Sequence, residues 1–193
     1  MKLYTTKSSP FGRCVRVLIR ELGLESQVSE FHDHPFDNHP DLLRTNPLAK
    51  IPCMIDSEGG ALFDSEVICS EIDQQFANGK FQPMDRTSRV NYSLVRGMMD
   101  VSVQLTIEKK KPKEQQSEFW LDRHCQAIER SLVRLQSETF SSSLTMVSIT
   151  VGCLLEYLDF RHQEHDWRQK YSQVYEKFQS LMDRTSFQDT QYQ

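Results

Sequence analysis

The chain has 193 residues, of which 38% are hydrophobic and 26% are charged, and its formal net charge is -4. This composition is typical of a globular protein with its own core and excludes a disordered chain. The acidic balance disfavours nucleic acid as a partner, because nucleic-acid-binding proteins usually carry a basic surplus. The most apolar stretch, residues 146–158, is too short and too polar to span a bilayer, so no membrane association is expected.

The cysteines and histidines argue against a disulfide framework and against a metal site. The five cysteines are odd in number and no pair has CxxC spacing, which favours a reducing compartment. Three histidines lie close together at positions 32, 34 and 39, but no cysteine or carboxylate stands at ligand spacing, so no metal is expected. The chain opens on Met-Lys-Leu-Tyr without an apolar signal segment, which favours a cytoplasmic protein.

The first eighty residues alternate strand and helix patterns. Residues 2–4 predict a short strand, and residues 27–31 predict a second one. Between them, residues 12–22 place apolar side chains at i, i+3, i+4 and i+7, which predicts an amphipathic helix. A strand, a helix and another strand in this order indicate a parallel crossover unit.

An irregular region is predicted next, because residues 32–46 are polar and contain two prolines. Two short apolar runs, 53–55 and 61–63, flank Gly59-Gly60 and predict a hairpin. A helix is expected over residues 65–76. Its predicted buried side chains are Val67, Ile68, Ile72 and Phe76.

The second part of the chain is entirely helical in pattern. Helical apolar spacing recurs over residues 90–105, 121–135, 146–160 and 167–181. The third of these segments is apolar almost all round, which predicts a helix buried inside a bundle. We therefore expect an α/β thioredoxin-like domain over residues 1–79, a linker over 80–84 and an all-α helical bundle over 85–193.

Three sequence motifs in this chain resemble the motifs of a known protein family. They are Ser8-Ser9-Pro10-Phe11-Gly12-Arg13-Cys14-Val15, Asn46-Pro47-Leu48-Ala49-Lys50-Ile51-Pro52 and Leu62-Phe63-Asp64-Ser65-Glu66-Val67-Ile68. In order and spacing they resemble the cytosolic glutathione S-transferases, and in particular the serine-containing theta-like, zeta-like and bacterial members. The resemblance covers nearly the whole chain and implies the glutathione transferase fold.

Ser9 is the catalytic residue that this resemblance implies. It directly precedes the first predicted helix, where free amides and the helix dipole favour an anion. A hydrogen bond from its hydroxyl to the sulfur of glutathione would lower the thiol pKa and stabilise the nucleophilic thiolate. A simple helix cap is the alternative role on spacing alone. Ser9 fits the family position better than Ser8, and a serine there disfavours the thiol-disulfide exchange of omega-type members.

The other two motifs imply contacts along the rest of glutathione. Pro52 corresponds to the cis-proline of the fold, which leaves the backbone of Ile51 free to pair with the cysteinyl part. Lys50 is placed to meet the glycyl carboxylate. Asp64 and Ser65 open a helix and are expected to bind the γ-glutamyl end, as helix N-termini bind anions. From sequence alone, a trans proline is favoured, because only about 5–6% of X-Pro bonds are cis, and a lone lysine is more often solvated. Asp64 could cap the helix and still pair with the ammonium.

Two further residues complete the expected glutathione contacts. Phe11 lies within the first motif, and His39 lies in the loop before the second. In the helical domain, Ser148 stands where the family has an aspartate that caps the buried helix, so a weaker cap is expected. Glu66 is a second departure, because the family prefers a small or apolar residue there.

The resemblance implies an enzyme that uses glutathione as co-substrate and needs no metal. The thiolate would attack a small electrophile, as in detoxification, and the protein would be a homodimer. Two alternatives stay open. One is a non-catalytic interaction or regulatory protein of the stringent-starvation type, and the other is a glutathione-dependent isomerase or dehalogenase.

Overall fold

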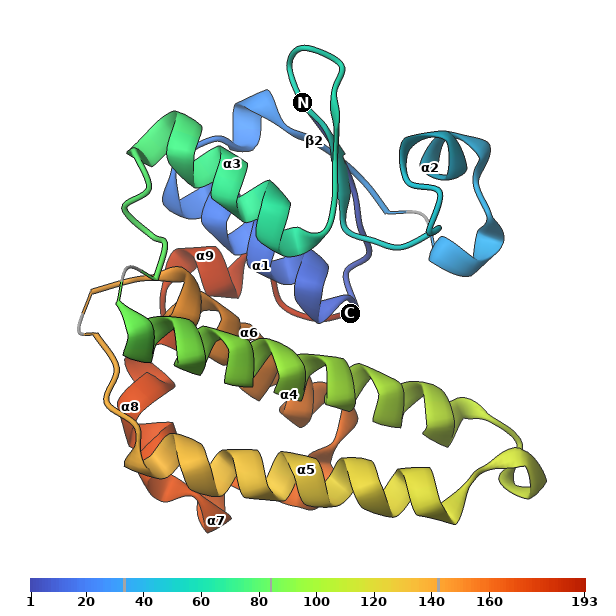
Figure 1. Ribbon diagram of the computed structural model, residues 1–193, viewed down its shortest axis with the longest axis vertical. Coiled ribbons are helices and arrows are strands. Elements are labelled where there is room, and N and C mark those ends of the chain that lie inside the picture. Colours follow the sequence, from blue (N-terminus) through green and yellow to red (C-terminus); the bar gives the residue numbers. More distant parts are fainter. Residues whose placement is uncertain (33, 84, 142) are drawn as a thin grey trace. The chain divides into compact units, whose positions relative to one another are not determined.

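The computed structural model describes residues 1–32, 34–83, 85–141 and 143–193. The chain forms two compact units, coloured along the sequence in Figure 1. The first contains Met1–Gln82 together with Asp183–Gln193, and the second contains Pro83–Met182. The linker expected over residues 80–84 includes Met84, which lies outside the described residues.

A four-stranded mixed sheet forms the centre of the first unit. Its strands are β1 (Lys2–Tyr4), β2 (Ser29–Phe31), β3 (Cys53–Ile55) and β4 (Ala61–Leu62), in the order β2-β1-β3-β4. β1 pairs with β2 in parallel, and β3 runs antiparallel to both β1 and β4. The predicted crossover unit and the predicted hairpin are both confirmed, in the thioredoxin-like arrangement.

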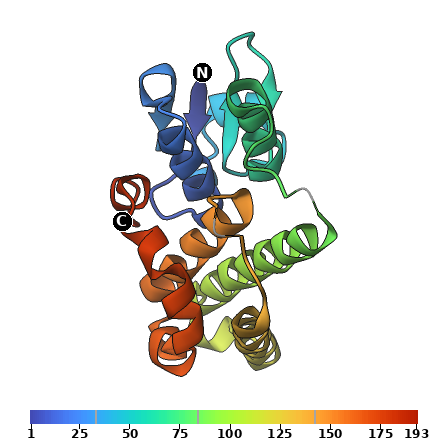
Figure 2. The same ribbon diagram turned by 90° about the vertical axis from the view of Figure 1, so that its left-hand side faces the viewer.

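Helices cover both faces of this sheet. α1 (Pro10–Glu21) and α3 (Ser65–Ala77) contact each other, and Figure 2 shows them side by side. On the other face, Leu42 of α2 (Pro40–Thr45) packs against Tyr4 and Cys53. Because side chains alternate along a strand, Leu3 and Met54, both fully buried, point away from Leu42 and toward α1 and α3.

The prediction that residues 32–46 are irregular was wrong. A 3-10 turn over Pro35–Asp37 is followed by the six-residue helix α2. Pro40 occupies the first position of α2, where a missing N–H costs nothing and the fixed φ suits a helix. The proline therefore begins this helix, although the pattern suggested a break in regular structure.

The buried face of α3 also differs from the expectation. Val67 is 42% exposed and Phe76 is 37% exposed, whereas Ile68 and Ile72 are buried as predicted. The remaining buried positions are Ser65, Cys69 and Asp73. The buried side chains of α3 thus form a stripe that lies about one residue away from the predicted stripe. The reason is that the neighbouring helix α1 contacts α3 on that side.

The second unit is an all-helical bundle, as predicted. It consists of α4 (Arg86–Lys110), α5 (Glu118–Ser137), α6 (Met146–Arg161), α7 (Trp167–Lys170) and α8 (Ser172–Met182). α4 and α5 run antiparallel (Figure 1), and α6 contacts both α4 and α8. Most of α6 is buried, which explains its apolar composition. The single helix expected over 167–181 is two helices, because the backbone leaves the helical conformation at Tyr171.

The cap of α6 is complete despite the missing aspartate. The Thr145 N–H donates to Ser148 Oγ at 2.9 Å, and the Ser148 N–H donates to Thr145 Oγ1 at 3.3 Å. Serine thus forms a reciprocal capping box with a neutral hydroxyl.

The last residues of the chain belong to the first unit. There, α9 (Thr185–Gln188) packs against α1. Among the residues that the structure describes, no helix has both the length and the apolar character needed to cross a membrane.

Candidate functional site

The sheet brings the three sequence motifs to one of its ends. Tyr4, the last residue of β1, pairs with Cys53, the first residue of β3. Leu62, the last residue of β4, pairs with Met54. The loop that leads to Ser9, the turn that contains Pro52 and the start of α3 therefore all adjoin the same end of the sheet.

A shared apolar cluster fixes these segments to one another. Tyr4, Leu42 and Cys53 form its buried part, and Ile51 and Phe63 pack against it. Ile51 belongs to the second motif and Phe63 directly precedes the candidate residues of the third. The cluster thus holds the backbone of both motifs beside the end of β1.

Ser9 caps the N-terminus of α1. Its Oγ accepts a hydrogen bond from the Gly12 N–H at 3.1 Å, and its carbonyl oxygen accepts one from the Arg13 N–H at 2.9 Å. The proposed capping role is therefore real, and it leaves the hydroxyl proton of Ser9 available to a ligand. The first turn of α1 contains no acidic side chain, so nothing in that turn opposes a negative charge at Ser9.

The second motif forms a turn whose last peptide bond, Ile51-Pro52, is cis, as the resemblance implies. Asn46 holds this turn: its side chain accepts from the Leu48 N–H at 3.0 Å and donates to the Lys50 carbonyl oxygen at 2.9 Å. Asn46 is almost completely buried. Asn46 is thus a supporting residue beyond the eight predicted ones, and its place at the head of the N-P-x-x-K-I-P motif is the signal for it in the sequence.

The third motif begins α3. The Asp64 side chain accepts from the Glu66 N–H at 2.9 Å and so caps the helix, while Ser65 is 6% exposed at the first helical position. The peptide bond between Phe63 and Asp64 is cis. The N-terminus of this thirteen-residue helix offers backbone amides to an anion.

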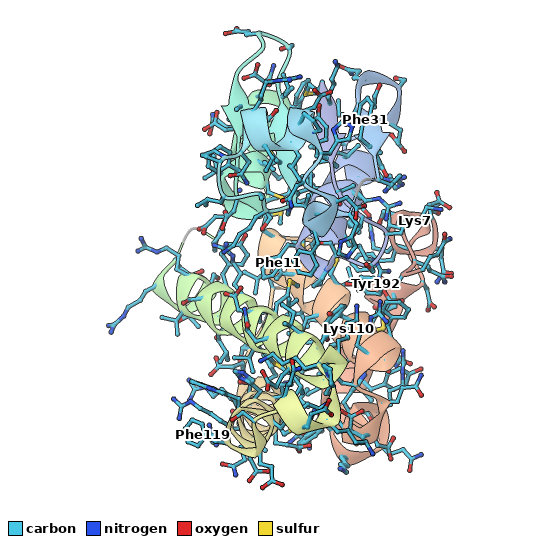
Figure 3. All side chains as sticks on the ribbon, turned by 90° about the vertical axis from the view of Figure 1, so that its right-hand side faces the viewer. Lys7, Phe11, Phe31, Lys110, Phe119 and Tyr192 are labelled. Atoms are coloured by element: carbon cyan, nitrogen blue, oxygen red, sulfur yellow. The ribbon has the colours of Figure 1, made fainter. Side chains whose placement is uncertain are left out.

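Three predicted contact residues are less constrained. Lys50 is exposed, and Phe11 is half-buried at the second position of α1. His39 is exposed and caps α2, with Nδ1 accepting from the Asp41 N–H at 3.4 Å. Figure 3 labels Phe11 among the side chains of this region.

The thiol next to Pro52 is not expected to act as a nucleophile. Cys53 is fully buried, and burial raises the pKa of its thiol to about 11. A thiol that stays protonated at neutral pH does not attack an electrophile. Within the described ranges, no group of three or more histidine, cysteine or acidic side chains is arranged to hold a metal ion.

Models of one protein family match residue ranges in both units. The family model for the glutathione S-transferase N-terminal domain matches residues 8–75, and the model for the C-terminal domain matches residues 118–176. The chain belongs to the glutathione S-transferase family and has the fold of that family. Residues 8–75 contain all eight candidate site residues.

Individual relatives agree with this assignment, two of them over nearly the whole chain and one over half of it. The uncharacterized GST-like protein YibF of Escherichia coli K12 is 28% identical, covering 99% of this chain and 98% of YibF. A glutathione transferase family member from Pseudomonas fluorescens Pf-5, solved with bound glutathione, is 32% identical with a TM-score of 0.93, covering 100% of this chain and 98% of that one. A stringent starvation protein A homolog from Haemophilus ducreyi is 26% identical over 50% of this chain and 41% of its own length.

Proposed function

We propose that the protein is a glutathione transferase in which Ser9 stabilises the thiolate of bound glutathione. One observation carries the proposal: the Ser9 hydroxyl already accepts from the Gly12 N–H, so its own proton is left to donate to sulfur. That hydrogen bond and the N-terminus of α1 both favour the anion and would lower the thiol pKa. The thiolate would then attack a small electrophile.

The rest of glutathione would lie along the end of the sheet. The backbone of Ile51, which precedes the cis-proline Pro52, would pair with the cysteinyl unit as an added strand does. Asp64 and Ser65 would hold the γ-glutamyl ammonium and carboxylate, and Lys50 would hold the glycyl carboxylate. The glutathione-bound relative from Pseudomonas fluorescens supports this class of ligand. Phe11 and His39 are proposed as peripheral contacts.

Glutathione binding and thiol ionisation test the proposal together. Isothermal titration with glutathione is expected to show binding, and ultraviolet thiolate absorbance followed against pH is expected to give a thiol pKa well below the ordinary value of about 8.5. Ser9→Ala should raise that pKa while binding persists. Ser8→Ala is the matched control, because it removes a neighbouring hydroxyl that does not cap α1, and it should leave the pKa unchanged.

The absence of binding at millimolar glutathione would overturn the enzyme hypothesis. Binding with the same thiol pKa in wild type and Ser9→Ala would leave a ligand-binding protein without activation of the thiol. Conjugation of a model electrophile by the wild type, and its loss in Ser9→Ala, would complete the case.

A regulatory interaction protein is the second candidate. The observation in its favour is the similarity to the stringent starvation protein A homolog over half of the chain. This candidate predicts a partner protein and no thiol activation, so the titration above separates the two. We further propose that the protein is cytoplasmic and forms a homodimer. Sedimentation velocity of the whole chain tests the homodimer.

A further inference from the structure

The last residues of the chain, 184–193, follow α1 from its end back to its beginning, and we call them the C-terminal strap. At the end of α1, Glu21 accepts from Arg184 Nε at 2.8 Å and from Arg184 Nη2 at 2.6 Å. The Ser186 hydroxyl donates to the same carboxylate. These contacts, together with Phe187, which is fully buried, attach the strap to the first unit.

At the beginning of α1 the strap encloses a buried cation. Arg13 is 1% exposed, although it carries a guanidinium. Its Nε donates to Thr190 Oγ1 at 3.3 Å and its Nη2 donates to the Phe187 carbonyl oxygen at 3.1 Å. The guanidinium also lies over two rings of the strap, 5.6 Å from the centroid of Phe187 and 4.4 Å from that of Tyr192. Burial of a charge is costly without such partners, so the contacts from the strap help to keep Arg13 buried.

The strap also reaches the loop that leads to Ser9. Lys7 Nζ donates to Gln193 Oε1 at 2.7 Å. Figure 3 labels Lys7 and Tyr192, which come from opposite ends of the chain and lie on the same side of the first unit. The loop and the first turn of α1 are thus both in contact with the last residues of the chain.

Arg13 is directly connected to Ser9 through the backbone. Its N–H donates to the Ser9 carbonyl oxygen at 2.9 Å. The other side of this turn is equally constrained, because a Cβ on Gly12 would lie 2.0 Å from Thr5 Oγ1. The turn that presents Ser9 is therefore held between Thr5 on one side and Arg13, with the strap, on the other.

We propose that the strap is a positioning element for Ser9, acting through Arg13. This inference rests on the proposed function, in which Ser9 donates to the glutathione thiolate. The ring of Tyr192 and the hydroxyl of Thr190 both contact the side chain of Arg13, and the amide of Arg13 bonds to the carbonyl oxygen of Ser9. Tyr192 and Arg13 are accordingly positioning residues.

Substitution of Tyr192 in the full chain tests the proposal. Tyr192→Ala removes the ring over Arg13 and is expected to raise the thiol pKa of bound glutathione and to lower kcat for a model electrophile about three- to tenfold, with a smaller change in glutathione KM. Tyr192→Phe keeps the ring and should restore wild-type values. Gln191→Ala, an exposed neighbour in the strap, is the control.

Hydrogen exchange gives a readout that needs no activity. The amides of Gly12 and Arg13 should exchange at least threefold faster in Tyr192→Ala than in the wild type, and at the wild-type rate in Tyr192→Phe. Unchanged exchange at these amides, or an unchanged thiol pKa in a glutathione-binding Tyr192→Ala variant, would overturn the positioning role. A wild-type protein that binds no glutathione would overturn the proposed function and, with it, the role of the strap toward Ser9.

Discussion

The imidazole Nε2 of His162 donates a hydrogen bond to the carbonyl oxygen of Ser102, 2.9 Å away, and so joins the end of α6 to the middle of α4. A carbonyl oxygen only accepts, so Nε2 carries the proton. The other ring nitrogen, Nδ1, faces Lys109 Nζ at 3.4 Å, with Glu164 Oε1 at 3.6 Å. His162 is completely buried, and burial, with a smaller contribution from Lys109, lowers its pKa. The folded protein therefore favours the neutral form of the ring.

This arrangement predicts a loss of stability in mild acid. The unfolded chain takes up a proton on His162 near its ordinary pKa of about 6.5, whereas the folded protein does so only at lower pH. The stabilisation is thus complete above about pH 7 and decreases as the pH falls below about 6.5. Urea unfolding followed by circular dichroism from about pH 7.5 to 5.5 should show a shallower slope for His162→Gln than for the wild type. Equal slopes in the wild type and in His162→Gln would contradict the assignment.

Two glycine-to-alanine substitutions should have opposite effects on stability. At Gly12, the new Cβ would lie 2.0 Å from Thr5 Oγ1, so Gly12→Ala should cost about 1–3 kcal/mol of unfolding free energy and disturb Ser9. At Gly97, in the interior of α4, a Cβ would meet no atom of the described residues within 4 Å beyond its chain neighbours and the backbone of its own helix. Gly97→Ala should therefore stabilise the protein by about 0.5–1 kcal/mol. Denaturant titration of both variants tests the pair, and a destabilised Gly97→Ala would refute the second half.

Thiol labelling should distinguish Cys125 from the other four cysteines. All five lie among the described residues, and Cys14, Cys53, Cys69 and Cys153 are buried, whereas Cys125 is partly exposed. Burial raises the pKa of both Cys53 and Cys125, so labelling should be slow overall and should occur first at Cys125. Iodoacetamide treatment of the native protein at pH 8, read by peptide mass spectrometry, checks this order. Early labelling of Cys53 would show that the turn at Pro52 opens in solution.

The capping box of α6 should contribute measurably to stability. Thr145→Ala removes the acceptor of the Ser148 N–H and should lower the unfolding free energy by about 1 kcal/mol. Ser117 precedes α5 without a side-chain capping bond, so Ser117→Ala should change stability by less than about half that amount. Thermal unfolding of the two variants makes the comparison, and equal losses would mean that the box adds nothing beyond an ordinary helix end.

The sequence alone determined those parts of the protein whose cause is local. The amphipathic spacing of residues 12–22 predicted α1, Gly59-Gly60 predicted the hairpin, and the apolar composition of residues 146–160 predicted a buried helix. Three motifs then gave the family and the candidate residues. The roles of those residues toward glutathione stay predictions, because chemistry at a site depends on a ligand as well as on the chain.

Tertiary structure decided what depends on residues far apart in the chain. The short helix α2 is stable because Leu42 packs against Tyr4 and Cys53, a contact that no local pattern displays. The buried stripe of α3 is set by its neighbour α1, so periodicity alone placed it one residue away. The strap is the clearest case. Arg13 and Tyr192 look like ordinary polar surface residues in the sequence, and only folding encloses the cation between rings at the other end of the chain.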